Sequence, residues 1–351
     1  LKGAPPSDSA ARELPCRRVP VERGASLSNG RATVMLWLVG LGIVVLVVAW
    51  LLEPYLAWRA TCARSLEALV AQMSFRAAPG EFVPASWRAP ELSLSVIVPA
   101  YNEELRLPQM LDETLAYLDA RVGAGPGDFS YELIVVDDGS WDRTYAAALA
   151  ADSSRDARGE LRVVRLASNR GKGFAVMVGM LMARGQLLLM ADADGATSIR
   201  DLERLERALA GGAARIAVGS RHHLSKQATA WASQAAVPLR EGLLGAARLA
   251  SRLVVGGPRP VRDTACGFKL FDAAAGKRIF SSLHLHRWAF DVEVLLLARL
   301  FGEGVAEVPV TWTDMPGSKF GALASAVCLL RDVLLVGLLY GFGVWRPSFA
   351  A

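Results

Sequence analysis

The sequence predicts an α/β fold built on a mostly parallel sheet with helices on both faces. Short runs of aliphatic and β-branched residues alternate along the chain with stretches of helical spacing, which is the pattern of β-α-β units. Polar or acidic turns directly follow three of these runs, and parallel sheets bind ligands at the carboxyl ends of their strands. We therefore expect right-handed crossovers and a ligand site at one edge of the sheet.

Five runs have the length and composition of buried strands. They are 92–100, 131–136, 161–166, 186–194 and 215–218. We expect helices over 105–118, over 142–151, from a glycine-bearing turn at 169–173 through Ala183, and from a capping pair, Ser198 and Asp201, through Leu209.

An uncharged apolar segment at 34–52 predicts a transmembrane anchor. At a rise of about 1.5 Å per residue it spans ~28 Å, the thickness of one hydrocarbon layer. It is longer than the apolar core of a typical signal peptide, so we expect it to stay uncleaved. The predicted organisation is a disordered tail at 1–33, this anchor, a juxtamembrane linker at 53–91, the α/β domain at 92–320 and a membrane-associated helical segment at 321–346.

Two further apolar stretches predict helices at a membrane surface. Residues 228–255 carry three arginines, including Arg240, near one helical face. In 323–345 a central Arg331–Asp332 pair makes a spanning helix costly, so we expect an interfacial helix. Packing against the protein's own sheet is the alternative.

The composition excludes some classes of protein and leaves others open. The chain has 351 residues, of which 52% are hydrophobic and 21% charged, and it is too apolar to be intrinsically disordered as a whole. Its net charge of +5 suits nucleic acid, a membrane surface or phosphorylated small molecules. The basic residues discussed below lie beside expected phosphate sites, and their placement gives no indication of nucleic acid.

Two acidic turns end predicted strands. Asp192 and Asp194 are one residue apart, a spacing that lets two carboxylates face one hard divalent cation, which in turn neutralises a diphosphate. Asp137 and Asp138 end another strand and offer acceptors for the N–H and O–H groups of a nucleoside. A solvated turn is the alternative for Asp192 and Asp194.

The segment SNRGKG at 168–173 combines glycines with two cations. It is not a Walker A loop, because Leu166 stands where a glycine is needed and Gly173 follows the lysine. Arg170 and Lys172 at a helix N-terminus nevertheless favour an anionic ligand, through their charge and through exposed amide N–H groups. A simple helix cap is the alternative.

The motifs VIVPAYNEE, VVDDGSWDRT, NRGKG and DADG, in this order, resemble the family 2 glycosyltransferases, which have the GT-A fold and use nucleotide-sugar donors. The resemblance covers about residues 93–320. It implies that the nucleoside is held by Pro99, Tyr101, Glu103 and Asp138, with Asp137 in support and Asp192 on the donor. It also implies that Asp194 binds Mg2+ or Mn2+.

The second half is similar to those family members that transfer glucose from UDP-glucose to dolichyl phosphate, more than to the mannose-transferring ones. The similar segments are GSRHH at 219–223, RDTACGFKLF at 262–271, RWAFDVEVL at 287–295 and WTDMPGSK at 312–319. The resemblance implies a catalytic set of Asp291, Arg221 and Lys269, a lipid-phosphate contact at Arg240 and sugar or acceptor contacts at Thr264 and Gly267.

The chemistry of the implied acceptor bears on mechanism. A lipid monophosphate is already largely ionised at neutral pH, so the acceptor brings its own nucleophile. Asp291 is therefore expected to position groups rather than to act as an obligatory base, and a single displacement would invert the donor linkage. A mannosyltransferase that uses GDP-mannose, or a non-catalytic module that binds nucleotide sugar or lipid phosphate, is the alternative.

The membrane orientation rests on two conflicting signals. Within about 20 residues of the anchor, four arginines precede it and two follow it, which favours a cytosolic N-terminus. The resemblance instead implies a catalytic domain on the cytosolic face of the endoplasmic reticulum. We expect a single-pass protein of that membrane with a cytosolic catalytic domain.

Overall fold

The structure is a computed structural model that describes ten stretches of the chain. They are 38–39, 41–42, 44–56, 74–75, 90–124, 128–153, 159–224, 238–257, 261–315 and 323–347. The chain divides into two units, residues 1–50 and 51–351. In the first unit the described residues are helical and lie within the predicted anchor, and the predicted tail at 1–33 lies outside the described residues.

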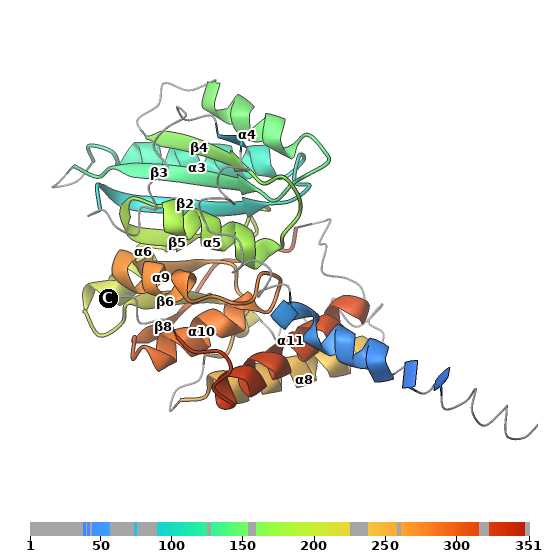
Figure 1. The fold of residues 1–351 in the computed structure, drawn as a ribbon. Helices are drawn as coiled ribbons and strands as arrows, with labels where there is room; N and C mark the ends of the chain where they lie inside the picture. Colours follow the sequence, from blue (N-terminus) through green and yellow to red (C-terminus); the bar gives the residue numbers. More distant parts are fainter. Residues whose placement is uncertain are drawn as a thin grey trace, which may run out of the picture. The chain divides into compact units, whose positions relative to one another are not determined.

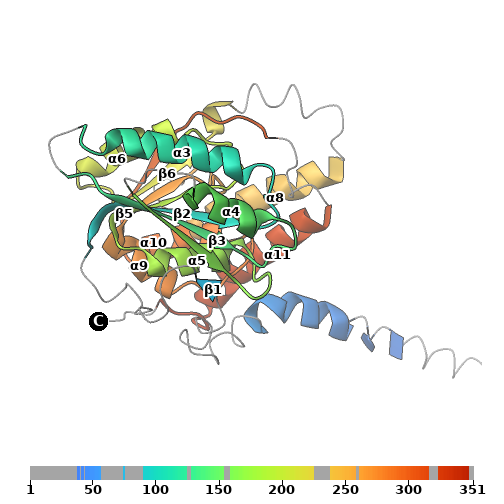
Figure 2. The same cartoon turned by 90° about the horizontal axis from the view of Figure 1, so that it is seen from above.

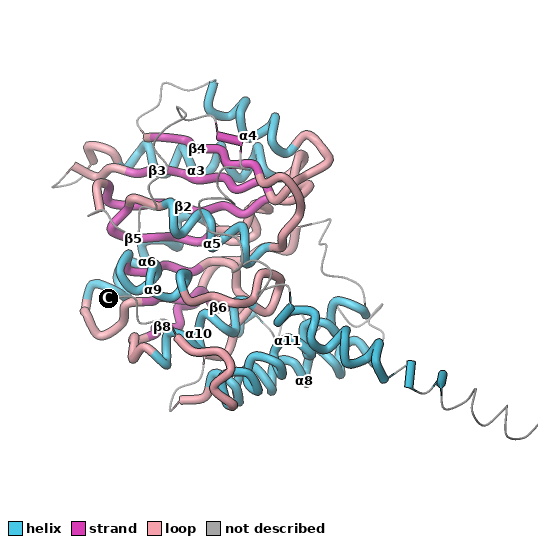
Figure 3. The backbone as a smooth tube through the Cα atoms, in the orientation of Figure 1, coloured by secondary structure: helices cyan, strands magenta, loops and turns pink. Residues whose placement is uncertain are grey.

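Among the described residues, eight strands form one mixed sheet in the order β1-β4-β3-β2-β5-β7-β6-β8 (Figures 1 and 3). The strands are β1 Ser74–Phe75, β2 Leu92–Ala100, β3 Tyr131–Asp137, β4 Glu160–Arg165, β5 Gly185–Met190, β6 Ile216–Ser220, β7 Lys269–Asp272 and β8 Val305–Pro309. The strands β4, β3, β2 and β5 are mutually parallel, as are β6 and β8, whereas β1 and β7 are antiparallel to their neighbours. The predicted α/β class is confirmed, with a sheet more mixed than expected.

The reversal of β7 has a consequence for the site. Because β7 runs against β5, its first residue, Lys269, pairs with Met190, the last residue of β5. The predicted strand at 186–194 therefore ends four residues early, and Asp192 and Asp194 belong to the turn that follows it. The start of β7 thus lies at the same edge of the sheet as the ends of the parallel strands.

The helices cover both faces of the sheet. Figure 2 shows α3, α4 and α6 on one face and α5, α9 and α10 on the other. Their bounds are α3 Leu107–Arg121, α4 Thr144–Ser153, α5 Lys172–Met182, α6 Leu202–Ala210, α8 Pro238–Val255, α9 Ala273–Ser281, α10 Phe290–Leu300 and α11 Leu323–Gly341, with short 3-10 turns at Ile199–Asp201 and His222–Leu224. All four predicted helical stretches are helical. Each face of the sheet carries its own apolar core.

The predicted capping pair before α6 is wrong. Neither Ser198 nor Asp201 makes a side-chain hydrogen bond to the start of its helix. The Asp201 carboxylate instead accepts the backbone N–H of Thr311 and forms an ion pair with Arg204. Its sequence position resembled a cap, but a loop from the far end of the chain competes for the same oxygens.

Helices α8 and α11 lie side by side and pack against α10 (Figures 1 and 2). Within the described ranges, Leu323–Gly341 is the one helix long and apolar enough to cross a membrane. Its Arg331 and Asp332 are buried and paired at 2.7 Å, and Arg331 also lies 3.2 Å from Glu53. The Arg331–Asp332 pair thus faces protein groups. The free-energy cost of placing this pair inside a membrane, from which we expected an interfacial helix, is therefore smaller than the sequence indicated. Residues 228–237 of the predicted basic helix lie outside the described ranges.

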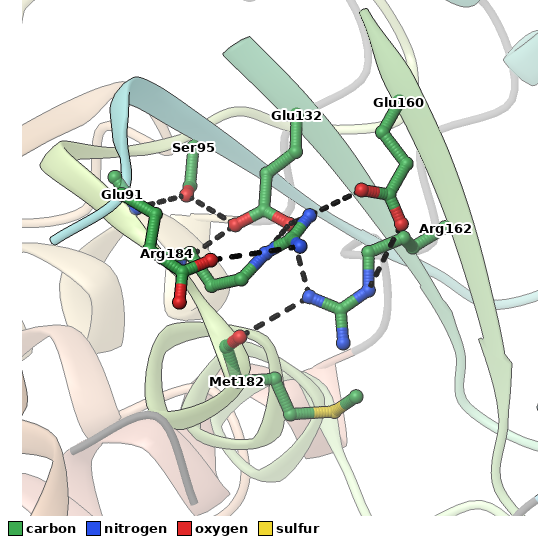
Figure 4. A network of polar contacts seen from close by, with 8 residues as sticks. Glu91, Ser95, Glu132, Glu160, Arg162, Met182 and Arg184 are labelled. Carbon is green, nitrogen blue, oxygen red and sulfur yellow. Dashed lines mark hydrogen bonds and ion pairs between the residues drawn. The ribbon is translucent and has the colours of Figure 1, made fainter. Parts of the chain in front are cut away.

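A buried carboxylate ties together the strands near their amino ends (Figure 4). Glu132 is fully buried and accepts hydrogen bonds from Ser95 Oγ at 2.6 Å, Arg184 N at 2.7 Å and Arg162 Nη1 at 2.9 Å. Burial alone would raise its pKa, but these donors and cations hold the pKa below its usual range. The network fixes this end of β2, β3 and β5 and leaves the polar turns to the opposite edge.

Candidate functional site

The turns after β2 and β3 are joined by reciprocal hydrogen bonds. Asn102 N donates to Ser140 Oγ at 2.9 Å, and Trp141 N donates back to Asn102 Oδ1 at 3.1 Å. Glu103 N donates to Thr144 Oγ1 at 2.6 Å. Asn102 has a φ of 54°, a left-handed conformation that asparagine tolerates better than most residues. The motifs YNEE and DDGSWDRT therefore build one rigid polar edge together.

Three of the predicted nucleoside contacts lie along this edge. Pro99 is in β2, in register with Val136 of β3, and the half-buried Tyr101 follows the end of the strand. The Glu103 carboxylate accepts two hydrogen bonds from the Arg106 guanidinium, each at 2.7 Å. Arg106 thus holds Glu103 in one orientation, a relationship that the sequence did not indicate.

The acidic pair at the end of β3 connects two turns. Asp137 is buried, accepts the backbone N–H of Ser140 at 2.9 Å and lies 3.2 Å from Arg165 Nε. Asp138 accepts the backbone N–H groups of Arg170 and Gly171 at 2.7 and 2.8 Å. Burial, opposed by these donors, raises the pKa of Asp138 to about 6. Asp138 therefore holds the glycine-bearing turn, whereas the sequence suggested only a ligand contact.

The glycines of NRGKG permit a close approach of two segments. A Cβ on Gly171, where φ is 102°, would lie 2.5 Å from the carbonyl oxygen of His286. A Cβ on Gly173 would lie 2.7 Å from Cβ of Phe290. Only glycine therefore lets the loop before α10 reach the first turn of α5, where Lys172 begins the helix. This loop was not predicted to contact the turn.

Lys172 joins the glycine turn to the D-x-D turn. Its Nζ lies 2.5 Å from Oδ1 of Asp192. Burial opposes the charge on both groups, but mutual attraction prevails, so the pKa of Lys172 is raised and that of Asp192 is lowered. Lys269 and Arg221 are close enough to lower the pKa of Asp192 further. The structure thus brings Lys172, Asp192, Lys269 and Arg221 near one another.

Asp194 differs from Asp192 in having less cationic support. Its Oδ1 accepts the backbone N–H of Ala196 at 3.0 Å, and its Oδ2 lies 3.9 Å from Arg106 Nη1. Burial and the neighbouring Asp192 charge raise its pKa above the usual range. Its partly exposed carboxylate is a ligand type that Mg2+ and Mn2+ accept, while within the described residues no group of three or more His, Cys, Asp or Glu side chains could hold a metal ion.

A buried ion pair joins β7 to α10. Lys269 Nζ lies 2.5 Å from Asp291 Oδ1 and donates to the carbonyl oxygen of Cys266 at 2.7 Å. Burial raises the pKa of Asp291, and the Lys269 and Lys172 ammonium groups oppose that rise. The Asp291 carboxylate is bound to the Lys269 ammonium group. In the structure its role is therefore to hold that cation.

The loop before β7 packs against the D-x-D turn. A Cβ on Gly267 would lie 2.0 Å from Asp192 Oδ2, so the missing side chain makes room for that carboxylate. Thr264 lies half-buried in the same loop. Gly267 therefore leaves the space that the Asp192 carboxylate occupies, in addition to any contact with a ligand.

Arg221 follows β6 and is held by a residue that sequence reasoning missed. Its Nε and Nη2 donate to Asp263 at 2.8 and 2.9 Å, and its backbone N–H donates to the same carboxylate at 2.9 Å. Glu307 on β8 in turn accepts the backbone N–H of Asp263 at 3.1 Å. The only sequence signal for Asp263 was its place in the motif RDTACGFKLF. Arg240 belongs to α8, and its predicted phosphate contact lies outside the described side chains.

The chain belongs to glycosyl transferase family 2, whose sequence profile matches residues 95–275. It is similar to the dolichyl-phosphate beta-glucosyltransferase of Homo sapiens, with 45% identity over 271 residues that cover 76% of this chain and 81% of the human protein. The Mus musculus protein of the same name is 42% identical over 323 residues, which cover 90% of this chain and 97% of that protein.

A solved structure of glucosyl-3-phosphoglycerate synthase from Mycobacterium tuberculosis, in complex with Mn2+ and UDP-Glc, is a more distant match. Its TM-score is 0.44 at 20% sequence identity, and the match covers 72% of this chain and 80% of that chain. The family assignment rests on the sequence matches alone.

Proposed function

We propose that this chain is a GT-A glycosyltransferase that transfers glucose from UDP-glucose to dolichyl phosphate, with inversion at the anomeric carbon. The observation that carries the proposal is the cluster around Asp192, where Lys172 and Asp194 come from the donor-side motifs and Lys269 and Arg221 from the acceptor-side ones. Cations and carboxylates that share one edge of the sheet suit a reaction between two phosphate-bearing substrates. The named relatives support the choice of glucose and dolichyl phosphate.

On the donor side, the joined turns after β2 and β3 would hold the nucleoside through Tyr101, Glu103 and Asp138. Asp194 would hold Mg2+ or Mn2+, which would neutralise the diphosphate leaving group. Lys172, held by Asp192 at the N-terminus of α5, would add its positive charge beside the same phosphates. The protein's contribution to the step is then alignment and charge stabilisation.

On the acceptor side, Arg221 and Arg240 would bind the lipid phosphate. Arg221 is held in place by two side-chain hydrogen bonds to Asp263, so its guanidinium is preorganised. Asp291 is paired with Lys269 and would position that lysine, while the phosphate oxygen of the acceptor attacks directly. Attack from the face opposite the diphosphate gives a β-linked product from an α-linked donor.

The test is a transfer assay in microsomes that express Asp194→Ala, with labelled UDP-glucose and added dolichyl phosphate. We expect loss of glucosyl lipid, with normal synthesis by the exposed-site control Asp112→Ala. Retained synthesis in Asp194→Ala would refute the metal assignment. Transfer from labelled GDP-mannose in place of UDP-glucose would indicate a mannosyltransferase, and tight UDP-glucose binding without turnover would indicate a binding module. The anomeric coupling constant of the product checks inversion.

The membrane arrangement is part of the same proposal. The anchor at 34–52, the linker at 53–91 and the helical segment at 321–346 would attach the GT-A domain at 92–320 to the endoplasmic reticulum membrane. We place that domain on the cytosolic side, with the active site near the lipid headgroups. Protease treatment of sealed vesicles should digest the domain, and protection of it would reverse the orientation.

A further inference from the structure

Glu293 joins the apolar helix α11 to the loop that borders the site. It lies fully buried in the first turn of α10, and Tyr340 in the last turn of α11 donates its hydroxyl to Glu293 Oε1 at 2.8 Å. Oε1 also accepts the backbone N–H of His284 at 3.0 Å and lies 2.7 Å from that residue's Nδ1. Oε2 accepts the backbone N–H of Leu285 at 2.7 Å. One carboxylate thus binds two helices and a loop together.

Aromatic packing strengthens this junction from the side of α11. The His284 ring stacks on Trp345 with ring centres 4.4 Å apart and planes 16° apart, and it meets Tyr340 edge-on at 5.6 Å. Trp345 lies four residues after the end of α11 and is almost completely buried. Leu338 and Phe342, on or just after the helix, are exposed. One side of α11 therefore docks on the loop, and another leaves apolar residues on the surface.

The loop held by Glu293 touches the first turn of α5. Phe174 N donates to the carbonyl oxygen of His286 at 3.0 Å, and the two aromatic rings meet edge-on at 5.0 Å. Gly171 and Gly173 fit against His286 and Leu285 only because they lack side chains. A shift of this loop would therefore move the residue between those glycines, Lys172.

The second connection runs through α10 itself. Asp291 and Glu293 share the first turn of that helix, and Asp291 binds Lys269. The positions of Lys172 and Lys269 therefore both depend on α10 and on the loop before it. Since Glu293 fixes this loop to α11, the contacts from Tyr340 to Lys172 and to Lys269 are continuous.

We propose that Glu293 is a positioning residue, through which the docking of α11 sets the placement of Lys172 and Lys269. The proposal deepens the proposed function and rests on it for the catalytic meaning of the two lysines. Turnover then depends on α11, although this helix does not itself line the site. A change in the docking of α11 would shift the residues at the phosphate-binding edge.

The first test measures placement directly, by hydrogen–deuterium exchange of the full chain in detergent. Tyr340→Phe removes one hydroxyl and keeps the ring, and Tyr131→Phe is the matched control, because its hydroxyl also binds a carboxylate, that of Asp119. We expect exchange over residues 283–290 and in the first turn of α5 to rise by about threefold or more in Tyr340→Phe alone. A change confined to α11, or an equal change in Tyr131→Phe, would overturn the proposal.

The second test measures enzyme kinetics in two variants, Tyr340→Phe and the isosteric substitution Glu293→Gln. Both variants should lower kcat by about tenfold while the KM for UDP-glucose stays close to that of the wild type. The melting temperature should stay near the wild-type value in Tyr340→Phe and fall in Glu293→Gln, whose amide NH2 must face a backbone N–H of His284 or Leu285. An unchanged kcat in both variants would contradict the proposal. If wild-type protein fails to transfer glucose, the proposed function fails, but the exchange experiment still decides whether α11 positions the two lysines.

Discussion

The Lys269 ammonium lies 2.5 Å from Oδ1 of Asp291, and both side chains are almost completely buried. Lys269→Met should leave the Asp291 charge buried and unpaired, and so lower the free energy of unfolding by about 3–5 kcal/mol. The double variant Lys269→Met/Asp291→Asn removes both charges and should regain most of that stability. It should still lack transferase activity, because the cation is gone. Unfolding in detergent and the microsomal assay measure the two effects.

The control for this pair is Arg200→Met, which alters an exposed cation in the short turn before α6. Its free energy of unfolding should stay within about 1 kcal/mol of the wild type. If the double variant is as unstable as Lys269→Met alone, the loss comes from packing of the lysine stem, and the argument from an unpaired charge is wrong.

Asp263 holds Arg221 and should affect the acceptor selectively. Asp263→Ala removes three hydrogen bonds to Arg221, so the guanidinium loses its fixed orientation. We expect the KM for dolichyl phosphate to rise by about tenfold, with less than about a twofold change in the KM for UDP-glucose. Steady-state kinetics with each substrate varied in turn provides the measurement.

A matched control removes a comparable ion pair elsewhere. Glu206→Gln weakens the interaction of Glu206 with Arg121, which joins α3 to α6. Both KM values should stay at wild-type levels in this variant. Equal changes in both KM values of Asp263→Ala would show that Arg221 serves donor and acceptor alike.

Gly267→Ala should disturb Asp192 by size alone. The new Cβ would lie 2.0 Å from Asp192 Oδ2, so that carboxylate must move away from Lys172. We expect the affinity for UDP in the presence of Mn2+ to fall by about tenfold or more, measured by titration calorimetry. Gly211→Ala is the control, because nothing lies within 4 Å of its added Cβ. Wild-type affinity in Gly267→Ala would show that the turn adjusts without loss.

The long periodic elements were predictable from the sequence because local pattern decides them. The run at 92–100 is β2 to the residue, and the apolar helix before Ala183 is α5. Strand β7 was not predicted, because it has four residues and forms only where β5 and β6 provide partners on either side. Its reversed direction follows from that pairing and not from its own composition.

The site was predictable to the extent that strand ends converge. Asp192 was expected at a strand end and Lys172 at a helix N-terminus, and in the structure the two side chains form an ion pair. The partner of Arg221 was not found, because Asp263 is 42 residues away in a loop whose path depends on the tertiary fold. Likewise, the link from Glu293 to Tyr340 joins residues that no local pattern relates.

Asp138 provides a pH-dependent prediction, since burial raises its pKa from 3.8 to about 6. A raised carboxyl pKa means that the folded protein binds this proton more tightly than the unfolded chain. The charged Asp138 carboxylate therefore destabilises the folded protein above about pH 6. This destabilisation is lost as the pH falls from about 6 toward 3.8, the pKa of the carboxyl in the unfolded chain. Relative to Asp138→Asn, the wild type should gain roughly 1 kcal/mol in free energy of unfolding between pH 7 and pH 5.

Urea unfolding in detergent gives the free energy of unfolding of the wild type and of Asp138→Asn at pH 7 and at pH 5. The prediction concerns how the difference between the two proteins changes between these pH values. Changes in other carboxylates cancel because they are common to both chains. Asp112→Asn, on the exposed side of α3, is the control and should show no pH-dependent offset from the wild type. An offset for Asp138→Asn that is constant with pH, or that favours the variant more at pH 5, would show that the carboxylate is ionised in the fold at both values and that the N–H groups of Arg170 and Gly171 outweigh its burial.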